Sequence, residues 1–185
     1  LLLRPLYEAL KNEVFKSDYC QADETTTPVV DKEKHKASKE YLWMVRSVME
    51  RLVLFHYDKG SRAGCVIEGL AKEYNFKGYL QCDGFAGYES AFKTSTDVSL
   101  VNCMAHIRRK FEYALEHDKE KAGYALSRIG ELYLIERECD EKEKTEDGRK
   151  DIRQLKAKPI MNELKGWFEQ MAVKYGSGTL LGKAV

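Results

Sequence analysis

GYLQCDGFAGY, residues 78–88, is the stretch in which the pattern that decides the fold is clearest. Tyr79 to Asp83 reads as a short strand, which Gly84 ends. Residues 85–92 then follow with a helical pattern, and the glycines free the backbone beside the aspartate. The stretch therefore predicts a strand, a turn that carries Asp83, and a helix.

Upstream of this stretch, the pattern predicts two helices and three strands. Leu6, Leu10 and Val14 recur at every fourth position, which is typical of a helix. Two strand-like runs are separated only by residues 49–51, a spacing that suits an antiparallel hairpin. The expected segments are a helix ending near Ser17, a strand over 19–30, an exposed polar loop over 31–39, strands over 41–48 and 52–57, and a helix beginning at residue 64.

Downstream, a strand over 98–103 and a helix over 105–116 are followed by helical periodicity alone, over 118–175. A charged stretch within this region, residues 139–151, predicts the turn of a long helical hairpin. Three strands in succession and then β-α-β units imply a mixed five-stranded sheet flanked by helices on both faces. The ribonuclease-H-like fold has this order. We therefore expect a core over 1–117, a helical insertion over 118–175 and a return toward the core over 176–185.

Composition excludes several classes of protein. The 185 residues carry 31 Lys and Arg against 30 Asp and Glu, and 43% are hydrophobic, as in a globular domain. The longest apolar run, residues 52–55, is too short to cross a bilayer. Five scattered cysteines without a CxxC pair predict reduced thiols in a cytoplasmic protein. A net charge of +1 gives no general argument for nucleic-acid binding. The absence of an initiator Met suggests a fragment.

Asp23 and Asp83 stand out as candidate site residues, because each lies in or at the end of a predicted strand. In a sheet ordered 3-2-1-4-5, their two strands are neighbours. Two carboxylates that meet there repel each other unless one is protonated or a cation bridges them, and Mg²⁺ or Mn²⁺ prefers such oxygen ligands. The alternative, that each aspartate only caps a strand or a turn, stays open on this reasoning. Glu24 is expected on the opposite face of its strand.

Five segments, taken in order, resemble bacterial transposases of the insertion sequence sixty-six family. The resemblance extends from about residue 18 to about 117, and the helical region that follows also fits it. The segments are ADET at 22–25, YLWMV at 41–45, the pair Ser61 and Arg62, GYLQCDGFAGY at 78–88, and CMAHIRRKF at 103–111.

This resemblance implies a DDE transposase catalytic core that uses Mg²⁺ or Mn²⁺ for phosphodiester cleavage and strand transfer at transposon ends. Asp23 matches the first catalytic and metal-binding acid and Asp83 the second. The third is a helical Glu in a segment resembling NN-x-x-E-R, which this chain does not contain; its last ten residues resemble the approach to it. We expect the isolated chain to be inactive. Glu131, Glu136 and Glu138 are interpreted as a solvated helix face.

The same resemblance implies double-stranded DNA at transposon ends and targets as partner, with self-association in a synaptic complex and no membrane. The candidate DNA contacts are Arg62, His106, Arg108, Arg109 and Lys110. A solvated helix face paired with Glu112 and Glu116 is the alternative for the three adjacent cations.

Two further alternatives concern the cysteines and the function. Cys103 and His106, with Cys82, supply three zinc ligands at most, so a packed thiol is favoured. Tyr41, Trp43 and Phe55 are expected in the core. The rival functions are a non-catalytic DNA- or protein-binding remnant and, more distantly, a nuclease or resolvase of the same fold.

Overall fold

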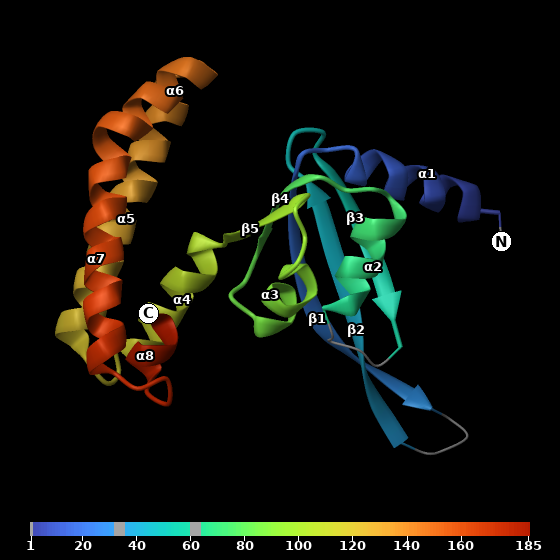
Figure 1. Ribbon diagram of the computed structural model, residues 1–185, viewed down its shortest axis with the longest axis horizontal. Coiled ribbons are helices and arrows are strands. Elements are labelled where there is room, and N and C mark those ends of the chain that lie inside the picture. The colour runs from blue at the N-terminus through green and yellow to red at the C-terminus, as the bar shows by residue number, and fades with distance from the viewer. Residues whose placement is uncertain (1, 32–35, 60–63) are drawn as a thin grey trace. The chain divides into compact units, whose positions relative to one another are not determined.

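The computed structural model describes residues 2–31, 36–59 and 64–185, and it divides into two compact units, Leu1–Cys103 and Met104–Val185 (Figure 1). Each unit has its own hydrophobic core. Arg62, a predicted DNA contact, and Ser61 of the same motif lie outside the described residues.

A mixed five-stranded sheet forms the centre of the first unit, with strand order β3-β2-β1-β4-β5. The first three strands pair antiparallel, whereas β1 with β4 and β4 with β5 pair parallel. This confirms the predicted order and ribonuclease-H-like topology. The strands are β1 (Tyr19–Asp31), β2 (Lys36–Ser47), β3 (Leu52–Asp58), β4 (Gly78–Cys82) and β5 (Val98–Asn102).

The β1–β2 ladder is longer than the sequence pattern predicted. It continues to the pair Asp31 and Lys36, so residues 36–39 belong to a strand and not to the expected loop. The reason is that backbone hydrogen bonds sustain a ladder even where the side chains are polar, and the hydrophobicity pattern does not record those bonds. The predicted loop residues 32–35 are outside the described part of the chain.

The helices of the first unit, α1 (Arg4–Phe15), α2 (Cys65–Glu73) and α3 (Ala86–Phe92), share one core on one face of the sheet. Alternate strand residues point into that core, among them Cys20, Ala22, Trp43, Val45, Leu54, Leu80 and Cys82. Within this unit the expectation of helices on both faces was therefore wrong. Phe55 was also wrongly expected in the core: it is 56% exposed, because β3 turns it to the other face.

Gly78 aligns β4 with β1. Its φ is +135°, and a β-carbon there would lie 2.1 Å from the carbonyl oxygen of Asp18, so only glycine fits without strain. The close approach lets the Tyr79 amide donate to that same oxygen at 2.8 Å. The Gly78 amide donates to the carbonyl oxygen of Asp97 at 2.8 Å, which ties the start of β4 to the loop before β5.

The second unit is entirely helical. Its core holds Phe111, Ile135 and Leu164, with Leu132, Trp167 and Phe168 packed against them. This agrees with the helical periodicity from which helices were predicted over 118–175. The helices are α4 (Met104–Ala114), α5 (Lys119–Glu141), α6 (Glu146–Ile152), a π-helical turn η1 (Arg153–Ala157), α7 (Lys158–Lys174) and α8 (Leu180–Ala184).

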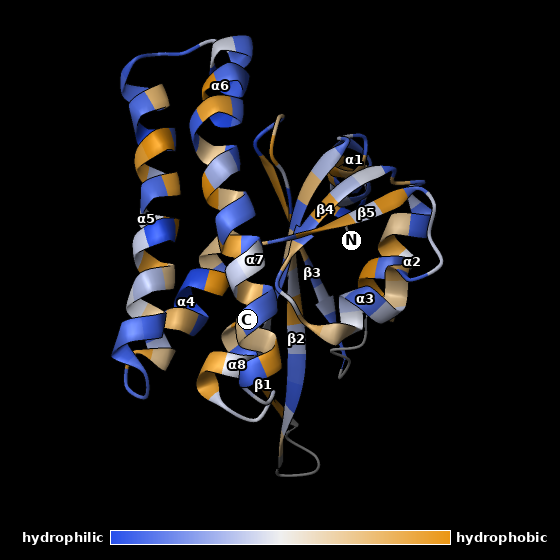
Figure 2. Ribbon diagram, turned by 60° about the vertical axis from the view of Figure 1, so that its left-hand side comes forward, coloured by the Kyte–Doolittle hydropathy of each residue, from blue (hydrophilic) through white to orange (hydrophobic). Residues whose placement is uncertain are grey.

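The charged stretch is mostly helix, and the turn of the hairpin is confined to residues 142–145 (Figure 2). Thr145 caps α6 by accepting from the Gly148 amide at 3.2 Å, which begins the second arm. Ion pairs between the arms stabilise the charged residues as helix, so the stretch did not need to be a loop. The helix α8 was not predicted. Among the described residues, no helix is long and apolar enough to span a membrane.

Candidate active site

Asp23 lies in β1 and Asp83 directly follows β4, and these two strands are parallel neighbours, as predicted. The register pairs Gln21 of β1 with Gln81 of β4, which is the last pair of this ladder. Continued by two residues, the same register would place Asp23 opposite Asp83. Gln21 Nε2 donates to Gln81 Oε1 at 2.7 Å, and the Tyr19 hydroxyl donates to the same oxygen at 2.6 Å. These bonds show that Tyr19, Gln21 and Gln81 point to the same face of the sheet, opposite the core. Because side chains alternate along a strand, Asp23 points to that face as well.

Local backbone bonds orient each carboxylate. Asp23 Oδ1 accepts from the Glu24 amide at 3.0 Å. Asp83 follows the last residue of β4, and its Oδ1 accepts from the Phe85 amide at 3.1 Å, the residue before α3. This second bond is the side-chain-to-backbone bond of an aspartate turn, so the Asp83 carboxylate is held at the point where the chain leaves the sheet.

A buried tyrosine supports the site from the core face. The Tyr88 hydroxyl donates to Glu24 Oε2 at 2.7 Å, and the ring is 1% exposed. The ring makes edge-to-face contacts with Trp43 and Phe85, at centroid distances of 6.1 and 6.5 Å. Burial, and secondly the bond to Glu24, raise the pKa of Tyr88, so the phenol stays protonated and keeps its proton for this bond. Glu24 therefore faces away from Asp23, as expected.

Glycines allow α3, the helix after Asp83, to pack closely against α2. A β-carbon on Gly87 would lie 2.3 Å from the Phe85 ring, and one on Gly64 would lie 2.0 Å from the Gly87 carbonyl oxygen. Sequence reasoning assigns the glycines of this segment only the role of freeing the backbone. In the structure they also bring α2 and α3 together over the sheet.

A small hollow of about 170 Å³ lies beside Asp23, on the face of the sheet opposite the core of the first unit. Leu42, Met44 and Phe55 supply its apolar wall. Sequence reasoning missed these three residues, although the signal was present: they alternate with the buried Trp43, Val45 and Leu54 along β2 and β3. The hollow gives the Asp23 carboxylate one apolar side.

Within the described ranges, no three His, Cys, Asp or Glu side chains are arranged to hold a metal ion. Among these described residues, Cys82, Cys103 and His106 are likewise not grouped as a metal site. Burial, with the nearby Asp83 charge as a smaller cause, raises the pKa of the Cys82 thiol to about 12. A buried thiol that stays protonated is unreactive, as expected for a packed, structural cysteine.

The three acids of α5 that were interpreted as a solvated helix face form ion pairs. Glu131 is paired with Arg128 at 2.7 Å, and Glu136 with Arg149 and Arg153 at 3.0 and 2.7 Å. Glu138 is paired with Lys142 at 2.6 Å and Lys156 at 2.9 Å. These pairs belong to the helices of the second unit, and the exclusion of the three acids as metal ligands stays a prediction.

The predicted DNA-contacting residues of α4 lie in the second unit. Arg108 pairs with Glu112, one turn along the same helix, as in the alternative interpretation. Arg109 and Lys110 are exposed, and His106 is half-buried. Arg62 falls outside the described residues. The assignment of these five residues to DNA stays a prediction.

Comparison with known proteins adds a family. The model of the family described as "Transposase IS66 family" matches residues 1–185. The chain is similar to the uncharacterized proteins y4qI and y4jD of Sinorhizobium fredii (strain NBRC 101917 / NGR234), at 26% and 27% identity over 99% of this chain. It also resembles y4hP of the same organism, at 23% identity over 89% of this chain. The chain spans about a third of the length of these relatives, 36%, 37% and 33% respectively.

Proposed function

Since the chain belongs to the IS66 family of transposases, we propose that its first unit is a DDE catalytic core in which Asp23 and Asp83 are two of the carboxylates that act on DNA. The observation that supports this proposal is the parallel β1–β4 register, whose continuation by two residues would align two acids sixty positions apart in the sequence. The alternative, in which each aspartate only caps a turn, accounts for Asp83 but not for its alignment with Asp23.

The donor set fits a divalent metal of the Mg²⁺ or Mn²⁺ kind. Both residues offer carboxylate oxygens, and each has one oxygen oriented by a backbone amide. When bound, such an ion activates the attacking water or 3′-hydroxyl and neutralises charge on the departing oxygen of a phosphodiester. The chain holds the two carboxylates in place, one from β1 and one from the end of β4. The Tyr88–Glu24 bond and the packing of α3 fix the turn that carries Asp83.

The partner in this proposal is double-stranded DNA at transposon ends and at the target, bound by a self-associating, cytoplasmic protein. Residues 118–175 are proposed as an insertion, and their helices share one core with α4 and α8. We further propose that residues 1–185 alone neither nick nor join DNA, because two carboxylates leave Mg²⁺ mostly water-ligated and weakly bound.

The test uses a protein of the relatives' full length that contains these residues, and DNA carrying the ends of the element that encodes it. We expect Mg²⁺- or Mn²⁺-dependent cleavage, lost in Asp23→Asn and in Asp83→Asn. Glu169→Gln is the matched control, since it also removes one carboxylate but on α7, where Glu169 is exposed and pairs with Lys165. Cleavage that survives in Asp83→Asn would contradict the proposal. DNA binding without cleavage by the parent protein would favour the non-catalytic remnant.

A further inference from the structure

A groove of about 700 Å³ runs between α4 and α5 within the second unit. Small residues, Ala105, Ser127 and Gly130, make it hollow. A β-carbon on Gly130 would meet nothing within 4 Å, so the space above this residue is open. The volume lies within the range in which proteins bind nucleotide-sized ligands.

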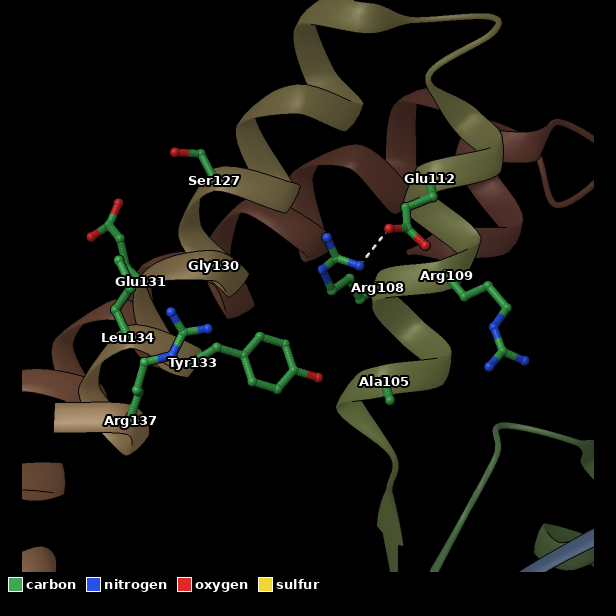
Figure 3. A pocket seen from close by; sticks show the side chains of 10 residues that line it. All are labelled: Ala105, Arg108, Arg109, Glu112, Ser127, Gly130, Glu131, Tyr133, Leu134 and Arg137. Carbon is green, nitrogen blue, oxygen red and sulfur yellow. Dashed lines mark hydrogen bonds and ion pairs between the residues drawn. The ribbon is translucent and has the colours of Figure 1, made fainter. Parts of the chain in front are cut away.

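Three larger side chains border the open space from two helices. Figure 3 shows the Tyr133 ring, from α5, and the Arg108 guanidinium, from α4, pointing into the gap from opposite sides. Arg137 lies one turn after Tyr133 on α5, and its guanidinium is beside that tyrosine. Tyr133 is 41% exposed, so its ring is accessible to a ligand.

Arg137 differs from the arginines of the helical hairpin. Arg128, Arg149 and Arg153 each have ion pairs with acids of α5 or α7. Over residues 64–185, which are described without a gap, Arg137 has no such pair. The hairpin therefore uses its other arginines for its own stability, while Arg137 keeps its positive charge available to a ligand.

Two acids, Glu112 and Glu131, also line the groove, but they do not neutralise the positive charge of Arg137. Glu131 points away from the gap in Figure 3, and Arg128 neutralises it from outside the groove. Glu112 pairs with Arg108, but this is an exposed pair one helical turn apart, a kind that contributes little stability. A phosphate can therefore replace Glu112 as the partner of Arg108.

We propose that this groove binds an unpaired segment of a DNA strand, with a base stacked on Tyr133 and phosphates held by Arg108 and Arg137. An accessible aromatic ring between two cations is the combination with which proteins bind single strands. A duplex keeps its bases stacked inside and cannot present a base face to Tyr133. This inference rests on the proposed function, since it names the form of DNA that the helical unit takes.

The experiment measures fluorescence anisotropy of a labelled oligothymidylate of about 12 nucleotides, in the size range of single-strand sites, and of a blunt duplex of equal length. Both are titrated with the 185-residue chain at several salt concentrations. We expect Tyr133→Ala and Arg137→Gln each to weaken binding of the strand about fivefold or more. Arg137→Gln should also lower the salt slope by about 0.7, the loss of one phosphate contact on a single strand. Duplex affinity should change less than about twofold, because Tyr133 and Arg137 are not among the residues predicted to contact a duplex.

Two controls keep the result specific. Tyr133→Phe retains the ring and should bind the strand as the parent does, and Lys174→Gln removes an exposed cation of α7 outside the groove. Far-ultraviolet circular dichroism checks that each variant is folded. Parent-like affinity in Tyr133→Ala or Arg137→Gln, or an equal loss in Lys174→Gln, would overturn the proposal. If these two variants weakened duplex binding by the same factor as strand binding, that would also overturn the proposal. The catalytic function is tested separately, by the aspartate-dependent cleavage described above.

Discussion

Tyr88 donates a 2.7 Å hydrogen bond to Glu24, and this bond joins the helix that follows Asp83 to the residue that follows Asp23. Both ends belong to segments that resemble the family, ADET and GYLQCDGFAGY. The donor is buried and the acceptor is a carboxylate, so the bond belongs to the stronger class of protein hydrogen bonds. The two aspartates are thus held by a shared scaffold in addition to the β1–β4 ladder.

Replacing Tyr88 by Phe removes this bond and leaves Glu24 without its buried donor. We expect the free energy of unfolding to fall by about 1.5–3 kcal/mol, the usual contribution of a hydrogen bond to a charged group. Chemical denaturation of the 185-residue chain measures it. Tyr113→Phe is the matched control, because Tyr113 is 62% exposed, and it should change stability by less than about 0.5 kcal/mol. Equal effects in the two variants would contradict a structural role for the bond.

Two glycines at and inside α2 should respond in opposite directions to alanine. Gly64→Ala places a methyl group 2.0 Å from the Gly87 carbonyl oxygen, so α2 and α3 must separate, and we expect a loss of about 2 kcal/mol or more. Gly69 lies inside α2, where an added methyl group would meet nothing within 4 Å, so Gly69→Ala should stabilise the chain by about 0.5–1 kcal/mol. Thermal unfolding compares them, and a stabilising Gly64→Ala would contradict the close packing.

The cysteines should differ sharply in reactivity. Burial raises the pKa values of Cys20 and Cys82 to about 12, and Cys139 is also buried, whereas Cys65 is exposed. At a pH of about 8 a thiol reagent such as Ellman's should therefore label Cys65 quickly and these three only on unfolding. Mass spectrometry of partially labelled chain identifies the sites. Rapid labelling of Cys82 in the folded protein would show that the end of β4 is open to solvent.

Acid should weaken the helical hairpin through Glu138. Hydrogen bonds from Lys142 and then Lys156 lower the pKa of Glu138 to about 2. A lowered pKa in the folded chain means that its stabilising effect is present above the ordinary value near 4.5 and is lost as the pH falls toward 2. Thermal unfolding at a pH of about 7 and of about 2 should therefore show a smaller difference for Glu138→Gln than for the parent. Glu116→Gln, on the exposed residue just after α4, serves as control and should behave as the parent does.

Sequence reasoning predicted the sheet because its strands include short, nearly continuous apolar runs such as residues 41–45 and 52–57. It paired Asp23 with Asp83 because the ribonuclease-H-like order makes their two strands neighbours. It failed where backbone bonds or distant charges decide the structure. Residues 36–39 are strand through their ladder with β1, and the charged stretch is helix through pairs such as Glu136 with Arg153. The outward-facing Phe55 was missed because an apolar residue in a strand reads as core when the covered face is unknown.

The groove residues were missed for a different reason. Tyr133 falls among the apolar residues of the hairpin by its spacing, and Arg137 lies within a run of charges that predicts only a solvated face. Their common environment depends on how α4 packs against α5, which no local pattern contains. The partners of Glu131, Glu136 and Glu138 were likewise hidden, although the conclusion that these acids are not ligands did not depend on them.

The most direct test of the central claim asks whether Asp23 and Asp83 share one divalent ion. Mn²⁺ is titrated into isotope-labelled chain, and paramagnetic broadening of the amide signals of Glu24 and Gly84 is followed by NMR. We predict that both signals broaden together, with one dissociation constant in the millimolar range. Asp83→Asn should abolish the broadening at Glu24, which lies on the other strand and is not itself altered. Broadening at Glu24 that persists unchanged in Asp83→Asn would show that the two carboxylates do not form one site, and would contradict the account.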